Sequence, residues 1–117
     1  MNNFKNLVVW QKSIKLAIIV YNITRSFPAQ EKYGLISQMN RSAVSVASNI
    51  AEGAGRNNTG EFYQFLGIAN GSISELETHI IIGHRLKFIA EADFVRLSSE
   101  IDTIQKLIYR LKESLKK

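Results

Sequence analysis

Apolar residues recur at alternating steps of three and four residues along most of this chain. Such a spacing places apolar side chains on one stripe of an α-helix, because a helix completes a turn in about 3.6 residues. The longest unbroken run lies near the C-terminus and comprises Phe94, Leu97, Ile101, Ile104, Ile108, Leu111 and Leu115. The pattern therefore predicts an all-α protein.

The first two helices can be bounded from residues that end helices. The first is predicted over about residues 8–26, because the ring of Pro28 pushes Phe27 out of helical geometry. The second is predicted from about Ile36 to the segment 53–55, which contains two glycines. Glycine readily adopts the left-handed backbone that ends many helices, so we expect these glycines to form the corner.

The remaining two helices begin at residues that favour helix N-termini. The third is predicted to start at Asn58 or Thr59, either of which can cap the free amide groups. It should run for about 30 residues, or about 45 Å. The fourth is predicted to start within residues 91–93, which include two acidic side chains. Four such helices with short connections predict one domain over residues 1–117, an up-and-down antiparallel four-helix bundle.

Composition excludes several classes of site. There is no cysteine, so disulfides, thiolate metal ligands and cysteine nucleophiles are excluded. The N-terminal segment lacks the pattern of a signal peptide, and the longest apolar stretch, LAIIVY, is too short to cross a membrane, so we expect a cytoplasmic location. The 15 Lys and Arg residues against 10 Asp and Glu residues leave a charge of +5. That excess permits an acidic partner such as nucleic acid without requiring one.

The first and third helices carry more apolar residues than one stripe needs. Large apolar patches on a surface usually mark an interface, so we expect a homo-oligomer. The alternative is a wide core stripe on long helices. Small residues at 67, 71 and 74 share one face of the third helix, where another helix could approach closely. The additional apolar residues are Val8, Val9, Ile18 and Val20 in the first helix and Phe65, Ile68, Ile81 and Ile82 in the third.

A line of polar residues follows the second helix, with a shorter run on the third. One interpretation is a solvated face or a hydrogen-bonded seam between helices or subunits, and the other is a ligand site. The structural interpretation is favoured, because buried polar groups are ordinarily paired with one another. The line comprises Gln38, Arg41, Ser45, Asn49, Glu52 and Arg56, and the shorter run comprises Ser72, Glu75 and His79.

Three stretches of the chain resemble the bacterial 23S rRNA intervening-sequence family of four-helix-bundle proteins. They are VWQKSIKL, FPAQEKYGLISQMNRSAVSVASNIAEGAGR and EFYQFLGIANGSISELET, within residues 7–89. The resemblance implies a bundle that assembles as a closed homopentameric ring and has no established reaction. A distantly similar pentameric bundle binds nucleic acid as an accessory factor to a reverse transcriptase, so the resemblance also implies RNA or DNA as a candidate partner.

The match to this family includes most of the polar line. Two positions depart from the family's pattern. Asn40 stands where arginine is common, which weakens a phosphate-binding role for this part of the second helix. Ala47 stands where proline is common, so a kink there should be milder. The polar residues that match the motif are Gln38, Arg41, Ser45, Asn49, Glu52, Ser72 and Glu75.

Enzyme motifs are missing from the sequence. A di-iron bundle needs two Glu-x-x-His motifs and further glutamates, whereas the only histidines are His79 and His84. The segment GAGRNNTG has Asn58 where the dinucleotide fingerprint requires glycine, and no strand precedes it. We therefore expect no enzymatic activity, no catalytic or metal site, no cofactor and no small-molecule substrate.

A basic C-terminal segment is the candidate nucleic-acid interface. Several lysines and arginines there could neutralise phosphates, and Tyr109 could stack on an exposed base. Two alternatives stay open: the lysines only keep the helix soluble, or the protein is an interaction scaffold or accessory factor that binds no nucleic acid. The candidate residues are Arg41, Arg56, Lys106, Arg110, Lys112, Lys116 and Lys117.

Overall fold

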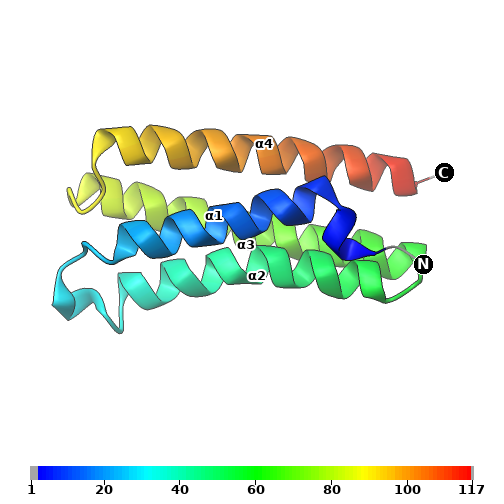
Figure 1. The fold of residues 1–117 in the computed structure, drawn as a ribbon, viewed down its shortest axis with the longest axis horizontal. Helices are drawn as coiled ribbons and strands as arrows, with labels where there is room; N and C mark the ends of the chain where they lie inside the picture. Colours follow the sequence, from blue (N-terminus) through cyan, green and yellow to red (C-terminus); the bar gives the residue numbers. More distant parts are fainter. Residues whose placement is uncertain (1–2, 117) are drawn as a thin grey trace.

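The computed structural model describes residues 3–116 and contains four long helices. They are α1 (Val8–Thr24), α2 (Leu35–Gly55), α3 (Thr59–Arg85) and α4 (Glu91–Leu115), with short 3-10 helices at Phe4–Asn6 and Ala29–Glu31. Successive helices run in opposite directions along a body measuring 45 × 24 × 20 Å (Figure 1). The predicted up-and-down bundle is confirmed, and the helix ends lie within about two residues of their predicted positions.

The helices pack in a ring in the order of the chain. Each helix contacts the one before and the one after it, and α4 closes the ring against α1. Within residues 3–116 the diagonal pairs, α1 with α3 and α2 with α4, make no backbone contact. The predicted stripes meet along the axis, and the largest fully buried side chains there are Leu16, Met39, Ile50, Leu66, Ile73, Leu76, Ile80, Leu97, Ile101, Ile104 and Ile108.

The corner between α2 and α3 is made by asparagines, contrary to the prediction that glycine makes it. Gly53 and Gly55 are both helical, and no described glycine has a positive φ. The left-handed residue is Asn57, with φ of 59°. Asn58 then caps α3, because its side chain accepts a hydrogen bond from the amide of Glu61 at 2.9 Å. Asparagine tolerates the left-handed conformation better than most residues do, which explains its use at this corner.

Gly53 instead permits α2 and α3 to approach closely. A Cβ added at Gly53 would lie 2.6 Å from the Cβ of Phe65. At the expected small-residue face of α3 the result is different: a Cβ at Gly71 would meet nothing within 4 Å, and one at Gly67 would meet only Lys112. Among residues 3–116, therefore, no helix uses the Gly67 and Gly71 face for close approach.

The end of α3 follows the geometry of a Schellman motif without its usual glycine. The amide of Phe88 donates to the carbonyl of Gly83 at 2.9 Å, and that of Lys87 donates to the carbonyl of His84 at 3.0 Å. These two bonds satisfy carbonyls that the helix leaves free. The left-handed position is occupied by Lys87, with φ of 66°. Gly83 faces inward here, because Ile89 packs where its Cβ would be.

The surplus apolar surface is smaller than predicted but real. Val9 and Val20 are buried in the core, so their assignment to an interface was wrong; the stripe of α1 is wider than one seam. Val8, Ile18 and Ile68 are each more than half exposed. Phe65 is half-buried, and Ile81 and Ile82 are exposed. None of the helices within residues 3–116 combines the length and the apolar character that crossing a membrane demands.

Candidate functional site

The middle of the polar line forms a hydrogen-bonded seam between α2 and α3. The hydroxyls of Ser45 and Ser72 share a hydrogen bond of 2.8 Å across the two helices. The side-chain amide of Asn49 donates to the backbone carbonyl of Ser45 at 2.8 Å and to its hydroxyl oxygen at 3.0 Å. The Ser45 hydroxyl thus accepts from Asn49 and is free to donate to Ser72. All three residues are half-buried, so the bonds replace water that packing excludes.

The end of the polar line ties α2 to the first turn of α3. Arg56 donates to Glu52 on its own helix through Nε at 3.0 Å and to Glu61 on α3 through Nη1 at 3.2 Å. Its guanidinium carbon also lies 5.0 Å from the ring centroid of Phe65. Arg56 therefore holds the corner between the helices, and two carboxylates neutralise its charge.

The rest of the polar line does not join this network. Gln38, Arg41 and Glu75 are exposed. His79 is half-buried, and its Nδ1 atom is buried without a hydrogen-bond partner among the described residues. The structure thus divides the predicted line into an interhelical seam, a corner clamp and three solvated side chains.

The basic residues of α4 differ in whether a carboxylate of this chain pairs with them. Lys106 pairs with Asp102 at 3.0 Å, and Lys116 pairs with Glu113 at 2.9 Å. The hydrogen bond that Lys116 donates to Glu113, and then the negative charge of Glu113, raise the pKa of Lys116 above its ordinary value. Arg110 is exposed, and Lys112 is half-buried beside α3. The predicted residue Lys117 lies outside the described residues.

A groove between α3 and α4 lies near the end of the bundle that carries both termini (Figure 1). We call it the tyrosine groove; it has a volume of about 260 Å³. Sequence reasoning found Tyr109 and the lysines but missed the α3 side, because the register of α3 against α4 cannot be read from either helix alone. The polar and aromatic residues that line it are Tyr63, Asn70, Gln105, Tyr109, Lys112, Glu113 and Lys116.

A second groove, between α1 and α2, is almost wholly apolar. We call it the apolar groove; it has a volume of about 300 Å³. Trp10 is half-buried there with its ring centroid 5.2 Å from that of Phe4, which folds back from the N-terminal 3-10 helix. The groove is lined by Phe4, Trp10, Ile14, Ala17, Val44, Ala47, Ser48 and Ala51.

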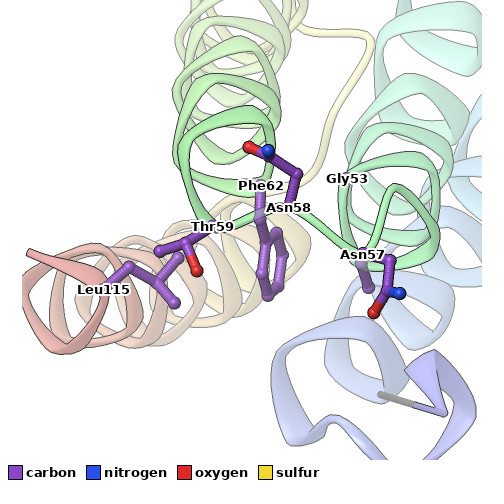
Figure 2. Close-up of a pocket in the computed structure, with 7 residues that line it drawn as sticks. Gly53, Asn57, Asn58, Thr59, Phe62 and Leu115 are labelled. Atoms are coloured by element: carbon purple, nitrogen blue, oxygen red, sulfur yellow. The ribbon is translucent and has the colours of Figure 1, made fainter. Parts of the chain in front are cut away.

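A third hollow lies at the α2–α3 corner. It measures about 180 Å³, and Phe62 lies between Leu115 of α4 and Asn57 of the corner (Figure 2).

At the other end of the bundle, His84 stacks on Phe94 with ring centroids 3.9 Å apart and contacts Glu91 at 2.8 Å. Within residues 3–116, no three His, Asp or Glu side chains gather in a group suited to a metal ion. The contacts of His84 with Phe94 and Glu91 hold the end of α3 against the start of α4.

Comparison with known proteins agrees with this architecture. No curated protein matches the chain. A crystal structure of a protein of unknown function from the S23 ribosomal protein family of Bacteroides thetaiotaomicron VPI-5482 superposes with a TM-score of 0.79. It shares 23% identity, and the alignment covers 89% of this chain and 97% of that one, so it shows a common fold. The family model for 23S rRNA-intervening sequence proteins matches residues 5–110. The chain therefore belongs to the 23S rRNA-intervening sequence protein family.

Proposed function

We propose that this protein is a non-enzymatic, cytoplasmic homo-oligomer that binds RNA or DNA through the basic surface of α4. The observation that carries the assembly is the apolar groove, which exposes a continuous apolar surface along α1 and α2. Val44 on one wall is 42% exposed, and Trp10 and Ile14 on the other wall are half-buried. Burial of such a surface by a second copy stabilises association by removing apolar area from water.

The order of the helices supports separate surfaces for assembly and for nucleic-acid binding. In the ring α1–α2–α3–α4, the α1–α2 side and the α3–α4 side are opposite each other. A copy docked on the apolar groove would therefore leave the basic part of α4 uncovered. The pooled charge of an oligomer would favour nucleic acid, since affinity for phosphates rises with the number that are neutralised.

A closed ring also needs a second, different contact surface on each subunit. Exposed apolar side chains at the end where α3 turns into α4 are suited to this role. They are Ile81, Ile82 and Leu86 of α3 and Val95 of α4. A ring of five, the number that the family resemblance implies, would carry five times the charge of +5 of one chain.

Native mass measurement with and without RNA tests this proposal. The wild-type protein should give a multiple of the 13.2 kDa chain mass, and the mass should rise with RNA at low salt. Val44→Glu places a charge in the apolar groove without touching the core, so it should dissociate the oligomer. Ser99→Glu, a matched change on exposed α4, should not. A wild-type protein with the mass of one chain would contradict the assembly, and no RNA binding at low salt would contradict the ligand.

A protein-interaction scaffold is the second candidate, favoured by the pairing of the basic residues. Arg56, Lys106 and Lys116 already contact carboxylates of this chain, which lowers the charge available to phosphates. Capture of one defined protein partner, unchanged when Lys112 and Lys116 are both changed to Glu, would support the scaffold. Loss of capture in that double variant would count against it.

A further inference from the structure

The tyrosine groove presents two aromatic rings in different settings. Tyr109 is 65% exposed, although it directly follows the fully buried Ile108 on α4. Tyr63 of α3 is half-buried on the other wall. An exposed ring beside a groove offers a face on which a planar group can stack, and every nucleobase has such a face.

Ammonium groups lie directly beside these rings. The Nζ atom of Lys112 lies 4.6 Å from the ring centroid of Tyr63, so the two helices are joined by a cation–π contact. The same Nζ atom lies over Gly67, one turn along α3, because a Cβ there would lie 3.7 Å from it, at ordinary van der Waals distance. Lys116 also lines the groove, and its contact with Glu113 is between exposed side chains, which contributes little stability. Both ammonium groups can therefore turn towards a phosphate.

Two amide side chains complete the lining. Asn70 of α3 and Gln105 of α4 both border the groove. Within residues 3–116 neither side chain hydrogen-bonds to another residue. Each amide offers two donor hydrogens and an acceptor oxygen, which is the pattern that reads the edge of a base.

The size of the groove restricts what can enter it. Its volume of about 260 Å³ is below the range of about 300–1,000 Å³ that is usual for drug-sized ligands. One flat ring fits this description better than a folded peptide or a whole duplex. In a duplex the base faces are hidden in the stack, so only an unstacked base can meet Tyr109 face to face.

We propose that the tyrosine groove binds an unstacked base of single-stranded nucleic acid, with Tyr109 stacking on the base. Asn70 and Gln105 contact its edge, and Lys112 and Lys116 contact the flanking phosphates. This inference rests on the proposed nucleic-acid function and adds the form of the ligand and its site. RNA and DNA single strands share the chemistry, and the test includes both.

Fluorescence anisotropy with labelled strands of about 10 nucleotides, and with their duplexes, tests the site at low salt. Wild type should bind single strands more tightly than duplexes. Tyr109→Ala should weaken single-strand binding by roughly 5- to 100-fold, the loss expected when one stacked base is removed. Tyr109→Phe keeps the ring and should bind within about twofold of wild type, because stacking does not require the hydroxyl.

Tyr33→Ala is the matched control. Tyr33 is 87% exposed and, like Tyr63, has a lysine near its ring, since the Nζ atom of Lys32 lies 5.5 Å from the centroid. It lies outside the groove, in the connection between α1 and α2, so its loss should leave binding unchanged. If Tyr109→Ala binds single strands like wild type, the site is wrong and the proposed function stands. If no strand or duplex binds wild type, both are wrong.

Ultraviolet cross-linking gives an independent readout of the same site. Trypsin should release residues 107–110 as one peptide, because it cleaves after Lys106 and after Arg110. A single strand bound as proposed should cross-link to this peptide through Tyr109. Cross-links confined to other peptides, with none in residues 107–110, would overturn the proposal.

Discussion

The Cα atom of Gly53 faces Phe65 so closely that a Cβ on Gly53 would lie 2.6 Å from the Cβ of Phe65. Real Cβ atoms essentially never come this close, so α2 and α3 can keep their separation only with glycine at this position. The contact lies beside the guanidinium of Arg56, which covers the ring of the same Phe65. A close approach and a polar clamp thus fix the same corner.

Gly53→Ala should destabilise the fold. The added methyl must push the helices apart, which costs about 1–3 kcal/mol even though alanine is the better helix former. Gly71→Ala is the control, since its methyl would meet nothing within 4 Å, and it should stabilise the helix by up to about 1 kcal/mol. Chemical denaturation of both variants measures the difference. Equal stabilities would show that the close approach does not constrain α2 and α3.

The bond between Ser45 and Ser72 should appear as an energetic coupling. Each single change to Ala should lower the free energy of unfolding by about 0.5–1.5 kcal/mol, because a half-buried partner loses its hydrogen bond. The double variant should be less destabilised than the sum, by at least about 0.5 kcal/mol. Ser74→Ala is the control, because the Ser74 hydroxyl donates to the carbonyl of Asn70 on its own helix and, among the described residues, bonds to no other helix. Strict additivity for Ser45 and Ser72 would contradict the seam.

Lys87→Gly should stabilise the protein. Lys87 occupies the left-handed position of the turn after α3, with φ of 66°, where a side chain costs about 1–2 kcal/mol. Glycine removes this strain but makes the unfolded chain more flexible, so the net gain should be about 0.5–1 kcal/mol. Thermal and urea denaturation measure it. Lys87→Ala keeps the strain and should give no gain, so a gain from alanine would point to the lost charge instead.

Arg56→Gln should lower stability by about 1 kcal/mol, which is the range of an exposed ion pair together with an exposed cation–π contact. The effect should shrink at high salt, because both contacts are electrostatic in part. Urea denaturation at low and high salt measures it. Arg41→Gln, which removes an exposed arginine of the same helix, should change stability by less than about 0.5 kcal/mol. A larger loss from Arg41→Gln would place the important contact elsewhere.

The same pairing predicts unequal contributions to nucleic-acid binding. Arg110 is exposed on α4, whereas Arg56 is held by two carboxylates. Arg110→Gln should therefore reduce both affinity for RNA and the slope of affinity against salt, by about one phosphate contact. Arg56→Gln should change neither. Anisotropy titrations at several salt concentrations measure both quantities, and a larger loss from Arg56→Gln would reverse the assignment.

Features that depend on one helix were predictable from the sequence. The apolar spacing predicts the four helices, and Asn58 is one of the two caps predicted for α3, the other being Thr59; the 2.9 Å bond from the amide of Glu61 shows that Asn58 is the cap. The polar line is predicted to pair internally, and on α2 Asn49 does so with Ser45, whereas the bond from Ser45 to Ser72 depends on the packing of α2 against α3. These features follow from apolar periodicity and from hydrogen bonds between residues close in the sequence, so they can be predicted from one helix alone.

Features that depend on two helices were not predictable in the same way. The role of Gly53 requires the distance between α2 and α3, and the clamp of Arg56 requires Glu61 to lie across the corner. The corner after α2 is predicted to be made by the glycines at 53 and 55, but Asn57 occupies its left-handed position. The left-handed Lys87 after α3 has no counterpart in the sequence prediction. Tertiary contacts decide these positions, and intrinsic preference yields to them.

The opposite placement of the apolar groove and the tyrosine groove has a consequence for binding strength. Subunits joined through the first would each display the second, spaced at the regular intervals of a symmetric assembly. A flexible strand long enough to bridge neighbouring subunits would occupy several of these grooves at once. It would dissociate only when all of the grooves released it at the same time. Avidity of this kind would give a long single strand a high overall affinity even if each groove binds one base weakly.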